Sequence, residues 1–490
     1  YLSYLLFLAW KGVIFDRILF FFLTVCVQTF YIHCISVYTG LHYIGQLHEN
    51  GLFKIIMDQI TEGQLQFVEL DKKYTIHSGK TEMEEHLKEQ FPDDTKAVEE
   101  FFKIMKVPGR TPILAAIKLI PQWVTLFLLK SGIADLCTSI FRLVTFFFWT
   151  GVPPKQSSCV INALLLHHYK RGAYYPKGGA SEIPFHIIKV IQKFGGRVLV
   201  RAPVNRILVD NNGAAYGVTV KKGQEDVEVR APVIISNCGV FTTFQELLPS
   251  HIQTKPDLDR GCLLVFSGFD ATQEELGINS SNTWLFKSND MDAMMDEYFS
   301  MGKDEAPDNI PMMYFTFPSA KDPTSKIRHP GKSCLTILTM VNYEWFEEWK
   351  DTPVRKRGDD YLEYKMRFGN NLFDLACRTP VLFLIHAVST PLSNTHYLGR
   401  YLGAMYSAEH NLERFQAEAL ARNRCDTPVK NLFISGQDVF SCGIAGALHG
   451  GLLCASTVLR HIVYIDLFML KKKLKRQNVR GTADRNKKLL

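Results

Sequence analysis

The feature that most constrains the fold of this chain is a strand, a turn and a glycine-rich helix at residues 431–451. The apolar run Leu432 to Ser435 predicts a short strand, and Gly436-Gln437-Asp438 predicts a turn. The apolar residues from Ile444 to Ile462 then predict a long helix. A strand, a turn and a helix in this order are typical of an α/β fold.

Four glycines remove side chains from one region of this helix, at positions 443, 446, 450 and 451. Inside a helix each Gly costs up to about 1 kcal/mol relative to Ala, so helix propensity does not explain them. A flat group lying against bare main chain would explain them. The partial positive charge at the helix N-terminus suits a flavin ring, whose N1–C2=O edge becomes negative on reduction. Close packing of the helix on a strand is the alternative explanation.

A second candidate site is the segment 171–182, where Pro176 and the pair Gly178-Gly179 predict a tight turn. The turn opens a helix predicted over Ser181 to Phe194, with Glu182 in its first turn, where an acidic side chain complements the helix dipole. From the residues alone, an ordinary capping turn is the favoured explanation. The short strands predicted after this helix are Arg197 to Val200, Val204 to Val209, Ala214 to Val220, Val227 to Arg230 and Val233 to Ser236.

Composition excludes several classes of protein. The chain is 47% hydrophobic and 21% charged, which is an ordinary globular balance. Residues 471–490 hold nine Lys or Arg against Asp484 alone, so this block accounts for the net charge of +7, and the rest is close to neutral. We therefore expect no nucleic-acid partner. The eleven cysteines show no zinc spacing, and the adjacent His167 and His168 suggest no metal site.

Several apolar stretches indicate contact with a membrane. The uncharged run Ile18 to Tyr38 is long enough to cross a bilayer as a helix, although a buried core helix is the alternative. Ile113 to Leu129, broken at Pro121, and Ile133 to Thr150 suit a monotopic insert or a cap over a substrate, with core helices as the alternative.

The basic block 471–490 follows the apolar run Ile462 to Leu470. Such a block attracts anionic lipid, at about 1 kcal/mol per charge near the surface, unless it is simply a solvated, disordered tail. The last four residues, 487–490, are similar to a dilysine retrieval signal of the endoplasmic reticulum. We expect localisation at the endoplasmic reticulum membrane.

The two candidate sites and several other segments resemble the flavin-dependent amine-oxidase and phytoene-desaturase superfamily, and within it the retinol saturase branch. Two strings are specific to that branch, Phe-Pro-Ser-Ala-Lys-Asp-Pro-Thr at 317–324 and Tyr-Glu-Trp-Phe-Glu-Glu-Trp at 343–349. The remaining matching segments are 39–45, 58–65, 175–179, 195–218, 235–237, 389–392, 403–406 and 431–451.

The resemblance implies an α/β fold, α+β overall, with an incomplete Rossmann-like flavin domain assembled from separated segments and an inserted mixed substrate domain. The implied division is a hydrophobic segment 1–38, substrate parts 39–170 and 241–390, flavin parts 171–240 and 391–465, and a basic tail 466–490.

The resemblance also implies a function and a site. The expected reaction is flavin-dependent saturation of the C13–C14 double bond of all-trans-retinol, with FAD as cofactor and NAD or NADP as a possible electron donor. No proton donor is assigned, and Tyr174, Tyr175 and His449 are candidates by proximity to the motifs. The implied cofactor contacts are Gly178 and Gly179 in a turn, Val204 at the adenine, Gly436, Gln437 and Asp438 at the ribityl and diphosphate groups, and Gly443, Ile444, Ala445 and Gly446 at the ring.

One departure from the family pattern is large. The family opens with a strand, a G-x-G-x-x-G turn and a helix, and this sequence contains no such fingerprint. Our hypothesis is a truncated product in which the run Ile18 to Tyr38 replaces the missing half-site. Two alternatives to the reductase follow: another polyene desaturase or isomerase, or an inactive membrane-bound fragment without a complete FAD site.

Overall fold

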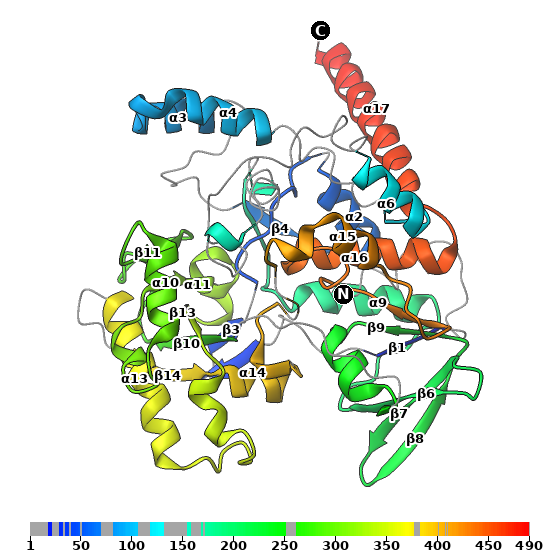
Figure 1. Cartoon of the computed structure of the whole chain (residues 1–490). Helices are drawn as coiled ribbons and strands as arrows, with labels where there is room; N and C mark the ends of the chain where they lie inside the picture. Colours follow the sequence, from blue (N-terminus) through cyan, green and yellow to red (C-terminus); the bar gives the residue numbers. More distant parts are fainter. Residues whose placement is uncertain are drawn as a thin grey trace.

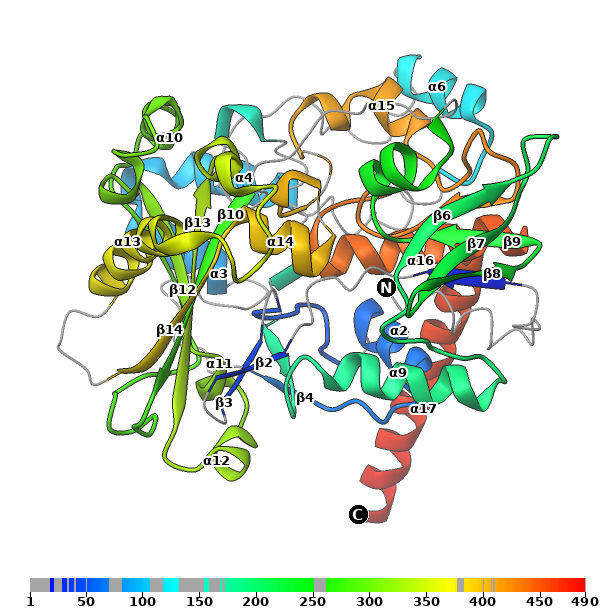
Figure 2. The same ribbon diagram turned by 90° about the horizontal axis from the view of Figure 1, so that it is seen from below.

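The computed structural model describes residues 18–21, 29–32, 35–38, 41–49, 51–69, 82–105, 118–131, 154–157, 168–169, 172–250, 261–376, 383–399, 401–406, 408 and 410–489. In Figures 1 and 2 the larger antiparallel sheet and the small parallel sheet lie on opposite sides of the molecule. The predicted mixture of helices and sheets is confirmed.

The larger sheet is antiparallel, and we call it the substrate sheet. Its strands, in spatial order, are β11 (Asn282–Phe286), β12 (Met312–Thr316), β13 (Ser333–Val341), β10 (Gly261–Phe269) and β14 (Phe383–Ser389).

Every residue of β10 is buried, as expected for a strand covered on both faces. The helix α13 (Gly358–Ala376) packs on β10 and β14, and the aromatic residues of its core come mainly from the string 343–349 and α13.

The smaller sheet is parallel, and we call it the cofactor sheet. It consists of β1 (Ile18–Phe21), β9 (Val233–Ser236) and β15 (Leu432–Ile434), with β9 in the middle. In the register, Ile235 lies between Phe20 and Phe433. Segments far apart in the chain thus form one sheet, and its core is shared with α2 (Leu52–Ile60), α9 (Glu182–Lys193), α16 (Gly443–Leu459) and α17 (Val463–Leu489).

Smaller sheets flank these two. An antiparallel meander of β6 (Val204–Val209), β7 (Ala215–Lys222) and β8 (Glu225–Arg230) projects from the cofactor side in Figure 2. The other pairs are β2 (Thr29–Ile32) with β3 (Ile35–Tyr38) and β4 (Phe67–Glu69) with β5 (Tyr174–Pro176). The remaining α-helices are α3 (Glu82–Gln90), α4 (Thr95–Met105), α6 (Gln122–Lys130), α10 (Met291–Ser300), α11 (Pro318–Lys321), α12 (Ser325–Arg328), α14 (Pro391–Leu398) and α15 (Ala417–Arg422).

Most central elements follow the sequence prediction. The helix expected at 181–194, the strand Val233 to Ser236 and the break at Pro121 are confirmed. The strand predicted at Arg197 to Val200 is wrong, because Leu199 and Val200 are 69% and 80% exposed and have no sheet to join.

The helix expected over Ile18 to Tyr38 is also wrong. The described parts of this run are the strands β1, β2 and β3. They consist largely of Ile, Phe, Tyr, Thr and Val, which favour strands over helices. In the described part of the chain no single helix has the length and apolar character for a bilayer span, and one bent pair, Gly443–Leu459 with Val463–Gln477 at 116°, meets the criteria together.

Two further predictions differ in outcome. The residues from Ile133 to Thr150 lie outside the described residues. The basic block is not a disordered tail over the described residues, because α17 extends from Val463 to Leu489.

Candidate cofactor-binding site

The turn between β15 and α16, at residues 436–438, is the centre of the candidate site, and we call it the central turn. Gly436 has a φ of +97°, which a glycine adopts without strain and which lets the chain reverse after the strand. Gln437 and Asp438 follow it and are each 4% exposed. The Asp438 carboxylate accepts hydrogen bonds from the backbone amides of Val240, at 3.0 Å, and Ala408, at 3.3 Å. Asp438 therefore ties the loop after β9 and the segment around 408 to this turn.

The side chain of Gln437 links the turn to the start of α16. Its Nε2 donates to the carbonyl oxygen of Tyr406 at 3.0 Å, and its Oε1 accepts from the amide of Gly443 at 3.2 Å. One of the amides that a helix N-terminus leaves free is thereby satisfied within the chain. The sequence left open whether Gln437 or Asp438 takes the polar role of the family. In the structure both side chains bind main-chain groups of neighbouring loops.

Basic side chains donate hydrogen bonds to the carbonyl groups of the same turn. Arg414 Nη2 donates to the carbonyl oxygens of Gln437, at 3.1 Å, and Asp438, at 2.7 Å. Lys118 Nζ donates to the carbonyl oxygens of Val439, at 3.0 Å, and Asn423, at 2.7 Å. Burial, with a further effect of Arg414, lowers the pKa of Lys118 to about 7. These side chains give the turn a positive surrounding, which favours a ligand that carries negative charge.

The glycines of α16 do not all have the role predicted for them. A Cβ at Gly446 would lie 1.6 Å from the carbonyl oxygen of Ser441, and a Cβ at Gly450 would lie 2.0 Å from that of Gly436. Close packing against the chain's own turn, which is the alternative that the sequence left open, therefore accounts for these two glycines by itself. A Cβ at Gly443 would meet nothing within 4 Å.

The start of α16 remains a predicted place for the flavin ring. Gly443 has a φ of +70°, which favours glycine, and Ile444 and Ala445 are half-buried. The contact of Gly443, Ile444, Ala445 and Gly446 with a ring stays a prediction, because the contacts around them involve only the chain itself.

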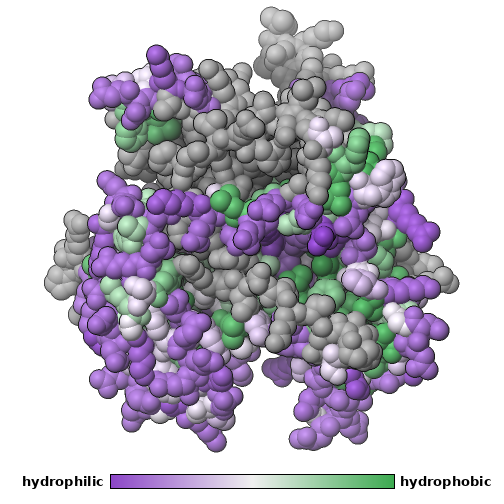
Figure 3. Space-filling view, in the orientation of Figure 1, coloured by the Kyte–Doolittle hydropathy of each residue, from purple (hydrophilic) through white to green (hydrophobic). Residues whose placement is uncertain are grey.

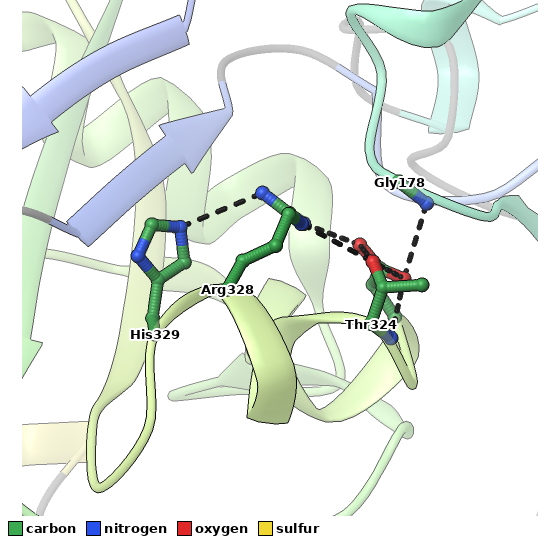
Figure 4. Close-up of polar contacts among 5 residues, drawn as sticks. Gly178, Thr324, Arg328 and His329 are labelled. Atoms are coloured by element: carbon green, nitrogen blue, oxygen red, sulfur yellow. Dashed lines mark hydrogen bonds and ion pairs between the residues drawn. The ribbon is translucent and has the colours of Figure 1, made fainter.

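The other predicted cofactor residues lie in two places. Gly178 and Gly179 both have a φ of +96° and form the expected turn before α9. This turn leads into Ala180 and Ile183, which share a core with Val439 and Leu448 beside the central turn. The amide of Gly178 donates to Asp322 Oδ1 at 3.1 Å, and Figure 4 shows this hydrogen bond as a dashed line from the Gly178 nitrogen.

Val204 begins the meander, and its contact with the adenine stays a prediction. It pairs with Val220 and packs against a separate core that includes Ile234 and Leu432 of the cofactor sheet. The structure therefore brings Gln437, Asp438 and Gly443 together, places the turn at Gly178 on the same core, and leaves Val204 at the meander.

Two buried polar side chains near Asp438 were not predicted from the sequence. Asn237, 3% exposed, follows β9, and in the part of the chain that the structure describes neither its Oδ1 nor its Nδ2 has a hydrogen-bond partner. His410 is fully buried, and neither ring nitrogen meets hydrogen-bond geometry with any of the described residues. Asp438 binds the amide of Val240, which is close to Asn237 in sequence, and the amide of Ala408, which is close to His410. A buried polar group without a partner is costly, so both residues fit a polar ligand such as the ribityl chain of a flavin. No sequence motif marks either residue.

The candidates for proton donor are positioned differently. His449 Nδ1 shares a hydrogen bond of 2.8 Å with the Tyr464 hydroxyl, and burial lowers the pKa of His449 to about 4. His449 also packs against the rings of Phe440 and Phe53. It is a core residue with a satisfied ring nitrogen, which fits packing better than proton donation. Tyr174 and Tyr175 are buried in β5.

Comparisons with known proteins agree with this architecture. Residues 130–459 match the family model of flavin containing amine oxidoreductases. The chain is 51% identical to a Danio rerio protein named inactive all-trans-retinol 13,14-reductase, over 90% of this chain and 81% of that protein. It is 36% identical to all-trans-retinol 13,14-reductase of Homo sapiens, over 92% of this chain and 82% of that protein.

The chain belongs to the all-trans-retinol 13,14-reductase family.

The resemblance seen in the sequence is thus confirmed. The fold is also similar to that of an oxidoreductase from Methanosarcina mazei, with a TM-score of 0.51 and 14% identity, over 94% of this chain and 97% of that one. In the described part of the chain no group of three or more His, Cys, Asp or Glu could hold a metal ion.

The strand β1 and the residues that follow it bear on the missing glycine fingerprint. The strand β1 lies parallel to the middle strand β9. The family pattern places a glycine turn after its first strand, but residues 22–39 contain no glycine. The described residues fit the polar chain of a flavin beside Asp438, whereas the sequence after β1 lacks the glycines with which the family pattern approaches the diphosphate.

Proposed function

We propose that this chain is a flavin-dependent oxidoreductase that saturates the C13–C14 double bond of all-trans-retinol. Membership of the all-trans-retinol 13,14-reductase family supports this proposal. The observation that carries it is the turn 436–438, where Asp438 ties two loops together beside Asn237 and His410, whose buried polar atoms form no hydrogen bond with the described residues.

The chain's own residues would bind and orient the reactants. Asn237 and His410 would hydrogen-bond the polar chain of FAD, which supplies the hydride chemistry when bound. Lys118 and Arg414 behind the turn would stabilise negative charge on the cofactor.

The decisive experiment is a visible spectrum of the purified 490-residue chain, followed by product analysis with all-trans-retinol. We expect flavin absorption near one equivalent per chain and formation of the 13,14-dihydro product when NADH or NADPH is supplied. Asp438→Asn should reduce flavin content, because an amide cannot accept from both the Val240 and Ala408 amides as a carboxylate does. The exposed Asp426→Asn is the matched control. No flavin absorption after reconstitution would contradict the proposal.

A second candidate is a family member that binds a retinoid without reducing it. The absence of glycine after β1 favours it, because the glycine turn at a helix N-terminus supplies much of the diphosphate affinity. This candidate predicts saturable quenching of the chain's tryptophan fluorescence by retinol, together with a spectrum free of flavin bands. Quenching with flavin bands and product formation would favour the reductase.

We also propose that the protein acts at the endoplasmic reticulum membrane. The helix α17 supports this, since Ile465, Phe468 and Met469 are 50%, 44% and 60% exposed and lie on one face ahead of the basic block. Figure 3 also shows a hydrophobic area over α6, where Trp123 and Phe127 are exposed. Replacing Lys487 and Lys488 by Ser should shift a fluorescently tagged chain away from this compartment in cells, and unchanged localisation would contradict the signal.

A further inference from the structure

The string 317–324, which the sequence analysis assigned to the saturase branch, carries two buried ionisable side chains, and only the contact of Asp322 with Gly178 has been described above. Lys321 is 2% exposed and Asp322 is 1% exposed. They follow β12, the second strand of the substrate sheet, and each of them has different hydrogen-bond partners.

Lys321 reaches the segment that precedes α2. Its Nζ donates to the carbonyl oxygen of His42 at 2.9 Å and also to Asn282 Oδ1. Asn282 Oδ1 in turn accepts from the hydroxyl of Thr316 at 2.7 Å, so the amine is fixed at the ends of β11 and β12. The amine also lies 5.6 Å from the ring centroid of Tyr43. Because its hydrogen-bond partners are neutral oxygens, burial lowers the pKa of Lys321 well below its ordinary value.

Asp322 reaches the turn before α9. Its Oδ1 accepts from the amide of Gly178 at 3.1 Å and from the amide of Thr324 at 3.0 Å. Its Oδ2 accepts from the Thr324 hydroxyl at 2.9 Å and from Arg328 Nη2 at 2.5 Å. Figure 4 shows Gly178, Thr324 and Arg328 directed toward this common acceptor. The carboxylate is thus fully bound, and one of its donors belongs to the candidate cofactor turn.

The two segments that the pair reaches are joined to each other. Ile44 and Tyr174 exchange both backbone hydrogen bonds, each at 2.8 Å. Residues 42–44 and 174–178 are therefore connected by backbone hydrogen bonds. Lys321 binds this pair of segments at His42, and Asp322 binds it at Gly178. A shift of either side chain would move these two segments relative to the substrate sheet.

We propose that Lys321 and Asp322 are positioning residues, which set the place of the Gly178–Gly179 turn relative to the substrate sheet and so align cofactor and retinoid. The inference rests on the proposed function for its consequence in catalysis. The alignment of reacting groups is sensitive to small displacements, since about 1 Å of misplacement can cost on the order of a hundredfold in rate.

The test compares Lys321→Met and Asp322→Asn with matched controls from the same region. Lys326→Met removes an exposed lysine paired with Glu274, and Asp270→Asn removes an exposed carboxylate paired with Lys332. Thr324→Val is a milder variant that removes the hydroxyl donor to Asp322, and it serves if Asp322→Asn does not fold. Hydrogen exchange of peptides covering residues 172–181 reports the position of the turn, and steady-state kinetics with retinol reports alignment.

We expect exchange at 172–181 to accelerate by about tenfold or more in the Lys321 and Asp322 variants only, as loss of buried hydrogen bonds implies. We expect kcat to fall by about tenfold or more while KM for retinol and flavin content change little.

Exchange equal to that of the controls would overturn the proposal, and so would faster exchange with unchanged kcat. If the wild-type chain does not reduce retinol, the proposed function fails, and the exchange comparison then decides by itself whether the pair positions the turn.

Discussion

At the scale of single residues, Lys118 couples the central turn to pH. Its pKa is about 7 in the folded chain, because burial disfavours the charged amine, and an exposed lysine in the unfolded chain has a pKa of about 10.4. Between these values the unfolded state binds one more proton, so this residue makes the free energy of unfolding rise with pH, by up to about 1.4 kcal/mol per unit. Lys118→Met should remove this slope between pH 7 and 10 in denaturant titrations. The exposed Lys96→Met should keep it, and equal slopes in both variants would contradict the assignment.

His449 makes the corresponding prediction on the acid side. Its pKa is lowered to about 4 by burial, from an ordinary value of about 6.5. Between these values the unfolded state again binds the extra proton, so the folded chain loses stability as pH falls from about 6.5 to about 4. His449→Gln should weaken this loss relative to wild type, measured by thermal unfolding at each pH. The exposed His396→Gln should leave the acid sensitivity as it is, and an unchanged profile in His449→Gln would refute the argument.

At the scale of elements, the glycines of α16 are set by the turn that packs on them. Gly446→Ala and Gly450→Ala would place a Cβ within 1.6 Å and 2.0 Å of the carbonyl oxygens of Ser441 and Gly436. Such overpacking typically costs about 1–3 kcal/mol, which outweighs the gain of about 1 kcal/mol in helix propensity. Both variants should therefore lower the unfolding temperature of the chain prepared without flavin. Gly302→Ala, where a Cβ would meet nothing within 4 Å, should not. An unchanged unfolding temperature in Gly450→Ala would mean that the turn can move.

The elements that the sequence predicted well are those whose signals are local. The helix before Gly195 and the strand before Asn237 have their own periodicity and end at residues that stop them. The run Ile18 to Tyr38 was misjudged because length and apolar character describe a membrane helix and buried strands alike, and only the partner strand β9 decides between them. Asn237 and His410 could not be found from spacing, because only the folded chain buries them. The Lys321–Asp322 pair could not be found either, because tertiary contacts alone bring its partners to it.

At the scale of the whole molecule, α17 has an anchored part and an exposed part. Val463, Tyr464 and Leu467 are buried in the core shared with α2 and α16. Beyond them the helix extends from the body in Figures 1 and 2. The bend of 116° after α16 directs it outward, so membrane attraction and folding depend on different residues of one helix.

The last prediction separates these two roles. Replacing the five basic residues of the exposed part by Ser should abolish binding to vesicles that contain phosphatidylserine, because each charge contributes about 1 kcal/mol near an anionic surface. The unfolding temperature should stay the same, since these side chains lie outside the core. Leu467→Ala should do the opposite, lowering stability by about 2–5 kcal/mol while vesicle binding at low temperature persists. Cosedimentation with vesicles should also weaken in wild type at high salt, where surface charges are screened. Vesicle binding by the Ser variant equal to wild type would show that α17 is not the membrane contact. The five residues are Lys471, Lys472, Lys473, Lys475 and Arg476.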